Sequence, residues 1–269
     1  MPGKQNNETT YRTQTIRSMN LPVLSIITVT RNAARVLEQT IISVLNQTYV
    51  NMEYIIIDGG SDDETVNIIK QYKSGISYWV SEADKGLYDA MNKGLRAATG
   101  NYVWFLNAGD VLKHNETVAE LAETATQNRL PDILYGETDL MDKKGHVFAE
   151  RRLKTPEALT WKSFRMGMLV CHQAFIVKRS IAPEYDLSYR FSADFDWCIH
   201  CLKEAKNVVN TRLRLVNYLY EGLTTANRKK SLKERYAIMC KYYGTFATSI
   251  THCWFAIRYY WAKWTKKTV

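Results

Sequence analysis

Apolar runs alternate with stretches of helical periodicity through the first hundred or so residues. Four runs are predicted to be β-strands because they are short, apolar and rich in β-branched residues, and they cover residues 24–30, 54–57, 76–80 and 102–106. Between the first two runs, Val36, Ile41 and Val44 share one helical face. Strands that alternate with helices are typical of βαβ units, so the pattern predicts an α/β fold with a mostly parallel sheet.

The pattern changes after residue 130. Strands are predicted at residues 132–141, 147–149 and 173–178, followed by a helix at 192–203 that begins at Ser192. No linker and no internal repeat interrupts the chain. We therefore predict three parts, which are a mobile leader (1–20), one folded body (21–227) and a helical tail (228–269).

The charge of the chain is concentrated in the tail. A hydrophobic fraction of 46% and a charged fraction of 23% indicate a folded protein rather than a disordered one. The net charge is +9, and residues 228–269 carry ten basic residues and one acidic residue. The body is therefore neutral, and a nucleic-acid partner is not predicted.

The five cysteines indicate reduced thiols in a cytosolic compartment, because residues 1–20 lack the apolar run of a signal peptide. Cys198 and Cys201 bracket His200, and Cys171 precedes His172, so a zinc site is one alternative. A single C-x-x-C pair without a second pair at ligand spacing favours buried core thiols instead.

Polar residues follow the first four predicted strands directly. They lie at Arg31–Asn32, Asp58–Ser61, Glu82–Lys85 and Asn107–Asp110. Parallel sheets bind ligands beyond the carboxyl ends of their strands, so these segments are predicted to form one site. Loop chemistry is the alternative for any one of them.

Several carboxylates and few histidines suit Mn²⁺ or Mg²⁺ bound together with a phosphorylated ligand. Asp110 is the leading metal candidate, because it follows a strongly apolar strand through the small residues Ala108 and Gly109. The alternative for Asp110 is a helix cap before Val111 and Leu112. The glycine patterns of P-loops and dinucleotide-binding sites are absent from the sequence.

Ordered motifs across the first half resemble those of glycosyltransferase family 2. They are the segments 24–32, 43–49, 56–65, 81–94 and 105–110. The resemblance is close over residues 22–112 and looser to about residue 225. It implies a GT-A fold over residues 21–227, in which 21–112 bind a nucleotide-diphospho-sugar and 113–227 face the acceptor. It also implies a divalent cation and inversion at the anomeric carbon.

The resemblance assigns roles to individual positions. It implies that Thr30, Arg31 and Asn32 lie beside the nucleotide of the donor. It also implies that Asp58 contacts the base or ribose, and that Asp84, Lys85 and Asn107 line the donor pocket. Asp110 matches the metal-binding acid of the family's D-x-D-type motif. Asn107 and Gly109 stand where other members carry acids, which weakens the expectation of metal dependence.

An inverting transfer needs a base that takes the acceptor proton. By the same resemblance Asp194, at the start of a helix, is implied to be that base, and Asp196 is the second choice. The alternative is that both acids only complement the helix dipole. His172 is expected to contact the donor phosphate or the acceptor, or to be a structural histidine.

The tail carries an apolar stripe at helical spacing with a predicted break near Gly244, and its members are Leu232, Tyr236, Met239, Tyr243, Phe246, Ile250, Cys253, Ile257, Tyr260 and Trp264. Residues 242–257 lack charges but are too short to span a bilayer. With tryptophans and basic residues nearby, the stripe favours an interfacial helix on an anionic membrane. The alternative is packing on the body or on a second subunit, as in a homo-oligomer.

Together these features predict an inverting glycosyltransferase that acts on a lipid-linked or membrane-proximal glycan in polysaccharide biosynthesis. Its expected place is the cytoplasm, peripheral on the inner face of the cell membrane. The rivals are a nucleotidyltransferase on a related α/β fold and a non-catalytic scaffold at the membrane.

Overall fold

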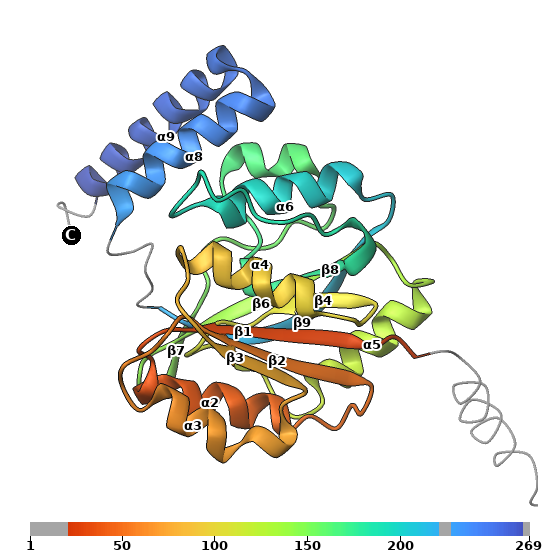
Figure 1. Ribbon diagram of the computed structural model, residues 1–269. Helices are drawn as coiled ribbons and strands as arrows, with labels where there is room; N and C mark the ends of the chain where they lie inside the picture. Colours follow the sequence, from red (N-terminus) through yellow and green to blue (C-terminus); the bar gives the residue numbers. More distant parts are fainter. Residues whose placement is uncertain (1–20, 221–226, 266–269) are drawn as a thin grey trace, which may run out of the picture.

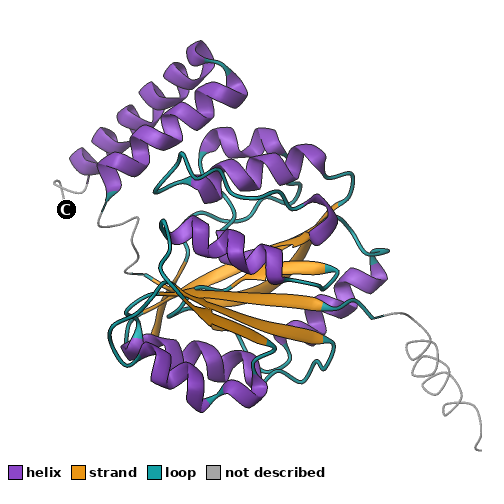
Figure 2. Ribbon diagram, in the orientation of Figure 1, coloured by secondary structure: helices purple, strands orange, loops and turns teal. Residues whose placement is uncertain are grey.

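A computed structural model describes residues 21–220 and 227–265. Within them one sheet lies between two layers of helices (Figures 1 and 2). The strands are β1 Leu24–Thr30, β2 Met52–Asp58, β3 Tyr78–Ser81, β4 Tyr102–Phe105, β5 Val111–Leu112, β6 Ile133–Met141, β7 Val147–Glu150, β8 Phe175–Lys178 and β9 Val208–Leu219. The α-helices are α2 Ala34–Leu45, α3 Thr65–Gln71, α4 Leu87–Ala97, α5 Thr117–Gln127, α6 Ala193–Glu204, α8 Arg228–Tyr243 and α9 Thr245–Thr265. The predicted leader, residues 1–20, lies outside the described residues.

The strand order is β3-β2-β1-β4-β8-β6-β9-β5, and β7 pairs with β6. The strands β3, β2, β1 and β4 are parallel neighbours. β8 is antiparallel to both β4 and β6, whereas β6 and β9 are parallel to each other. Six of the described strands therefore share one direction, which confirms the predicted α/β class with a mostly parallel sheet.

The two faces of the sheet bury separate hydrophobic clusters. Side chains alternate along a strand, so Ile27 and Val29 of β1 pack with residues of α4 and α6 on one face. Leu24 and Ile26 pack with residues of α2 and α5 on the other face. Because β1 is buried on both faces, its residues read as a continuous apolar run, and the predicted strand coincides with the observed one.

Two elements of the second half escaped the sequence prediction, α5 and the long strand β9. β9 pairs with β6 along most of its length and with the two-residue strand β5. The alternation of Arg212, Leu213, Arg214 and Leu215 is a strand signal that could have located it. β9 matters for the site because it ends at Leu219, beside the turn that follows β4.

The tail forms a helical hairpin that packs on the body, as Figure 1 shows. Gly244 joins its two helices with a φ of 80°, so the predicted break is confirmed. α8 binds the body through polar contacts, since Lys241 Nζ lies 2.9 Å from Asp196 Oδ1 and Tyr243 Oη donates to the carbonyl of Trp161. The described residues contain no helix long and apolar enough to cross a membrane.

Candidate functional site

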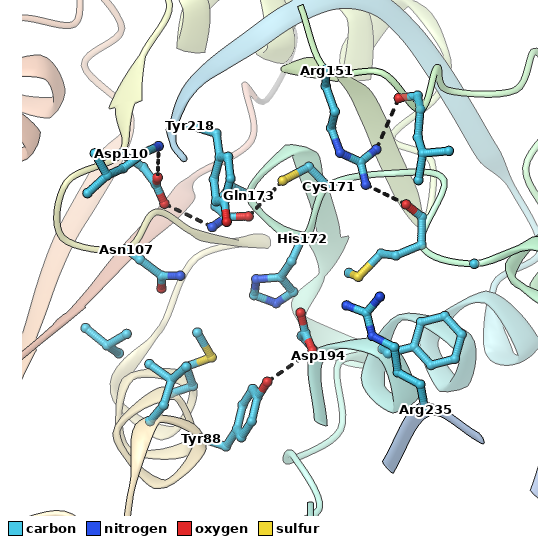
Figure 3. A pocket seen from close by; sticks show the side chains of 18 of the residues that line it. Tyr88, Asn107, Asp110, Arg151, Cys171, His172, Gln173, Asp194, Tyr218 and Arg235 are labelled. Carbon is cyan, nitrogen blue, oxygen red and sulfur yellow. Dashed lines mark hydrogen bonds between the residues drawn. The ribbon is translucent and has the colours of Figure 1, made fainter. Parts of the chain in front are cut away.

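A cavity of about 950 Å³ opens at the carboxyl ends of β1, β2, β4 and β9 (Figure 3). This volume is near the top of the usual range for small-ligand sites, about 300–1,000 Å³. Seven of the predicted site residues line the cavity, namely Thr30, Arg31, Asp84, Asn107, Asp110, His172 and Asp194. The sheet edge thus brings the strand-end segments together, as parallel topology requires.

Four predicted residues do not line the cavity, namely Asn32, Asp58, Lys85 and Asp196. Asp58 is fully buried and accepts hydrogen bonds from the amide of Ser61 and the hydroxyl of Ser81. Asn32 accepts from the amide of Asp62 at 3.0 Å and so joins the turns after β1 and β2. These two side chains shape the loops around the cavity, and Lys85 is exposed to solvent.

Asp84 approaches the backbone after β2. A Cβ added to Gly59 would lie 2.8 Å from Oδ2 of Asp84, so the carboxylate occupies the space that a side chain at position 59 would need. The carboxylate of Asp84 also forms an ion pair with Lys93 of α4. The predicted donor residue is therefore held by α4, and the absence of a side chain at Gly59 leaves room for it.

Asp110 is fixed by the turn from β4 into β5. Gly109 has a φ of 100°, a conformation that favours glycine. The two oxygens of Asp110 accept from the amide of Leu219 at 2.9 Å and from Nε2 of Gln173 at 3.0 Å. Burial raises the pKa of Asp110 from 3.8 to about 7. The predicted alternative of a helix cap is wrong, because the residues that follow form strand β5.

The donor set around Asp110 fits a divalent cation that also binds phosphate. Asn107 Oδ1 is buried without a hydrogen-bond partner among the described residues, and both side chains line the cavity. One carboxylate and one amide oxygen suffice for Mg²⁺ or Mn²⁺, which complete their shells with water and phosphate oxygens. Over the described part of the chain, no group of three or more histidine, cysteine or acidic side chains converges.

Asp194 and Asp196 point to different surroundings from the first turn of α6. Asp194 lines the cavity and accepts a hydrogen bond from Tyr88 Oη at 3.0 Å. Asp196 is buried and pairs with Lys241 of α8. Residues two apart on a helix face different directions, so the tertiary structure presents only Asp194 of this pair to the cavity. Tyr88, which the sequence analysis did not single out, holds that carboxylate.

His172 lies at the floor of the cavity inside an aromatic cluster. Its Nε2 is 2.6 Å from Tyr185 Oη, and its ring packs against Phe105 and Trp197. Burial lowers the pKa of His172, which favours the neutral imidazole. These contacts favour a structural histidine that shapes the site.

Basic residues from outside the first half complete the cavity wall. Arg235 of α8 and Arg258 of α9 line it together with Arg152, which follows β7. The sequence analysis assigned the basic residues of the tail to a membrane surface as a group. No local signal separates these two arginines from the rest, because their position depends on how the hairpin packs.

The cysteine pair lies in the protein core. Cys198 and Cys201 are buried in α6, and burial raises the pKa of both thiols well above their ordinary range. His200, between them, is exposed. The geometry of the three side chains therefore does not match the zinc alternative.

Comparison with known proteins identifies the family. The family model described as "Glycosyl transferase family 2" matches residues 25–184. A "PGL/p-HBAD biosynthesis glycosyltransferase" of Mycobacterium tuberculosis is 32% identical over 190 residues, which cover 68% of this chain and 71% of that protein. An uncharacterized glycosyltransferase of Haemophilus influenzae is 28% identical over 194 residues, covering 71% of this chain and 76% of its own.

Solved structures of S. aureus TarS share the fold. The fragment 1–349 in complex with UDP-GlcNAc has a TM-score of 0.65 at 15% identity and covers 81% of this chain and 66% of its own. The match spans 65% of the same fragment without ligand and 40% of the longer TarS chain. The likeness confirms the predicted GT-A architecture. The match over residues 25–184 and the mycobacterial relative at 32% identity show that the chain belongs to glycosyl transferase family 2.

Proposed function

We propose that this protein transfers a sugar from a nucleotide-diphospho-sugar to an acceptor hydroxyl with inversion. The observation that carries the proposal is the arrangement of two acids and one amide around one cavity. Asp110 and Asn107 lie on one side of it and Asp194 on the other, as Figure 3 shows. A donor phosphate end and a proton-accepting end are the two parts that such a transfer needs.

The donor end is formed by the loops after β1, β2, β3 and β4. Thr30, Arg31 and Asp84 line it, and TarS, whose fold is shared, has been solved in complexes with UDP and UDP-GlcNAc. These observations support a nucleotide-diphospho-sugar as donor, with UDP as the first nucleotide to test.

Asp110 and Asn107 would hold Mn²⁺ or Mg²⁺ together with the donor diphosphate. When bound, the cation would offset the negative charge of the departing nucleoside diphosphate. This chain's own contribution is to keep Asp110 in place through Leu219 and Gln173.

Asp194 is the proposed base. Among the acids that line the cavity, Asp84 is paired with Lys93, and Asp110 accepts hydrogen bonds through both oxygens. Asp194 keeps one oxygen outside the hydrogen bond from Tyr88, so it can accept the acceptor's hydroxyl proton. A single displacement with one such base inverts the anomeric carbon.

The test is a panel of nucleotide sugars with Mn²⁺, read by thermal shift and by the released product. A donor stabilises the folded state by mass action, and slow hydrolysis in water should release a nucleoside diphosphate. Pyrophosphate release would instead indicate a nucleotidyltransferase, and binding without turnover would indicate a scaffold. Neither rival is supported by the relatives described above.

The outer face of α9 supports a second proposal, contact with an anionic membrane. Its exposed side chains are Phe246, Ile250, Trp254, Ile257 and Trp261, spaced by three or four residues. Elsewhere on the same helix, Thr248 and Thr251 are buried. This inverts the usual order of a soluble helix and suits a helix whose apolar face enters the lipid headgroup region. A lipid-linked or membrane-proximal acceptor and a peripheral location on the inner face stay predictions, as does a homo-oligomer.

A further inference from the structure

The wall of the cavity opposite the donor loops is built by the helical hairpin, outside the part of the chain that matches the family. Residues of this wall come from α8 and α9, and they are Leu232, Arg235, Met239, His252, Phe255 and Arg258. The family match ends at residue 184. This wall is therefore a feature of this chain that the family assignment leaves without a role.

Arg235 is the central charge of the wall. Its guanidinium lies over the ring of Phe195, the residue after Asp194, at 5.7 Å. Its Nε is buried and has no hydrogen-bond partner within the described residues. A buried guanidinium donor without a partner is costly, so its place at a cavity indicates a ligand with acceptor oxygens.

Three further groups that line the cavity carry an unpaired donor or a positive charge. His252 Nε2 is also buried without a partner in the described chain. Arg258, one turn and a half further along α9, lies over the ring of Phe255, and Arg152 adds a third guanidinium. Arginine forks match the oxygens of phosphate in particular.

The position of Arg235 separates this end from the donor. Figure 3 shows Asp194 between Arg235 on one side and Asn107 and Asp110 on the other. Since Asp194 is the proposed base, a group beyond it belongs to the acceptor. Arg235 would therefore meet an anion that the acceptor carries near its reacting hydroxyl.

Apolar side chains surround these charges. Met166 and Leu232 line the cavity and are 44% and 49% exposed, which leaves apolar surface at its mouth. Met168, Met239 and Phe255 extend this surface inward. A ligand that combines phosphate with an apolar chain complements both features.

We propose that the acceptor is a phosphate-bearing amphiphile, with its phosphate bound by Arg235, His252 and Arg258 and its apolar part on the wall of the hairpin. This inference rests on the proposed function and names the substrate class of its acceptor end. The helical hairpin then forms part of the active site.

The experiment uses the full chain and farnesyl phosphate as the probe. Calorimetry is run with the donor end already occupied by UDP and Mn²⁺, so that the phosphate of the probe can bind only at a separate site. Farnesyl phosphate should bind under these conditions, and farnesol and inorganic phosphate should each bind at least about tenfold more weakly, since each lacks one half of the contact.

Two substitutions locate the phosphate. Arg235→Gln and Arg258→Gln should each weaken farnesyl phosphate about tenfold or more, while UDP affinity changes far less. Lys233→Gln removes one charge from the exposed side of the same helix and is the matched control. Arg258 is exposed, so its variant should fold even where replacement of Arg235 does not.

Three results would overturn the inference. The first is that farnesyl phosphate does not bind once UDP is present, and the second is that the arginine variants behave like Lys233→Gln. The third is that they weaken UDP binding as much as binding of the probe, which would assign Arg235 to the donor diphosphate. Absence of both UDP binding and donor hydrolysis in the unaltered protein is a different outcome. It would remove the proposed function itself, and with it the acceptor.

Discussion

Asp194 and Asp196 are two positions apart in α6, but their side chains lie in different surroundings. Asp194 faces the cavity with Tyr88 as its hydrogen-bond partner, and Asp196 faces Lys241. Replacing Asp194 by Asn removes the proposed proton acceptor, so kcat should fall about 10²–10⁴-fold. Donor affinity, measured by calorimetry, should stay within about threefold because the donor loops are untouched.

Asp196→Asn is the matched control for that variant. It removes the negative charge of one ion pair between α6 and α8, so the midpoint of thermal unfolding should drop while kcat changes little. The opposite pattern, with chemistry lost at position 196 and kept at 194, would reverse the choice of base.

Asp110 makes the stability of the cation-free protein depend on pH. Its pKa is raised from 3.8 to about 7 by burial, so the native state binds a proton more tightly than the unfolded state. The free energy of unfolding should therefore fall as pH rises between these two values. From pH 5 to pH 8 in chelator, this contribution is about 3 kcal/mol.

Asp110→Asn should remove that contribution, which urea unfolding at the two pH values can measure. Parallel pH dependence in the two proteins would show that Asp110 is not the titrating group. Saturating Mn²⁺ with UDP should reduce the loss in the unaltered protein, since a cation favours the ionised carboxylate.

At the scale of elements, α4 packs on the sheet at a distance that only glycine allows. A Cβ added to Gly94 would meet Cγ2 of Ile27 in β1 at 2.4 Å. Alanine is favoured over glycine in a helix by about 1 kcal/mol, but overpacking a core typically costs about 1–3 kcal/mol. We expect Gly94→Ala to lower the free energy of unfolding, because β1 and α4 are both held by neighbours.

Urea unfolding measures this change, with Arg96→Ala as the control on the same helix. Arg96 pairs with Glu184 at an exposed position, and such pairs contribute about 0–1 kcal/mol. A Gly94→Ala protein more stable than the original would mean that α4 can shift outward without loss.

The burial of the strands also explains which of them could be predicted from the sequence and which could not. The strands β1, β2 and β4 are buried on both faces and were visible as apolar runs. β9 is only partly buried and contains arginines, one of which, Arg214, pairs with Asp139 and Glu150. Its pairing with β6 is a long-range contact that local periodicity does not reveal.

At the scale of the whole molecule, the basic hairpin has two faces with different expected partners. One face closes the cavity, and the other presents Trp254 and Ile257 to solvent. Deletion of residues 228–269 would remove Arg235 from the cavity as well, so it would not isolate membrane contact. Point substitutions on the outer face of α9 avoid this problem.

The double variant Trp254→Ser/Ile257→Ser should bind vesicles that contain anionic lipid at least about tenfold more weakly, because it removes apolar surface that would enter the headgroup region. Sedimentation with such vesicles measures the change, and thermal unfolding checks the fold. Val50→Ser, at an apolar residue that is 88% exposed on the body, is the control. Equal sedimentation of all three proteins, or of none, would contradict the membrane proposal.

The sequence by itself determined the α/β class, the family and the segments that meet at the carboxyl edge of the sheet. Those features depend on local periodicity and on short motifs, and Thr30, Asn107, Asp110 and Asp194 could be located from them. Which side chains face the cavity was decided by tertiary structure. Arg235 reaches the cavity because α8 packs on α6, and Asp196, which the helix directs away from Asp194, meets Lys241 of α8 in the same packing. Both outcomes depend on contacts between segments distant in the chain, which no local pattern encodes.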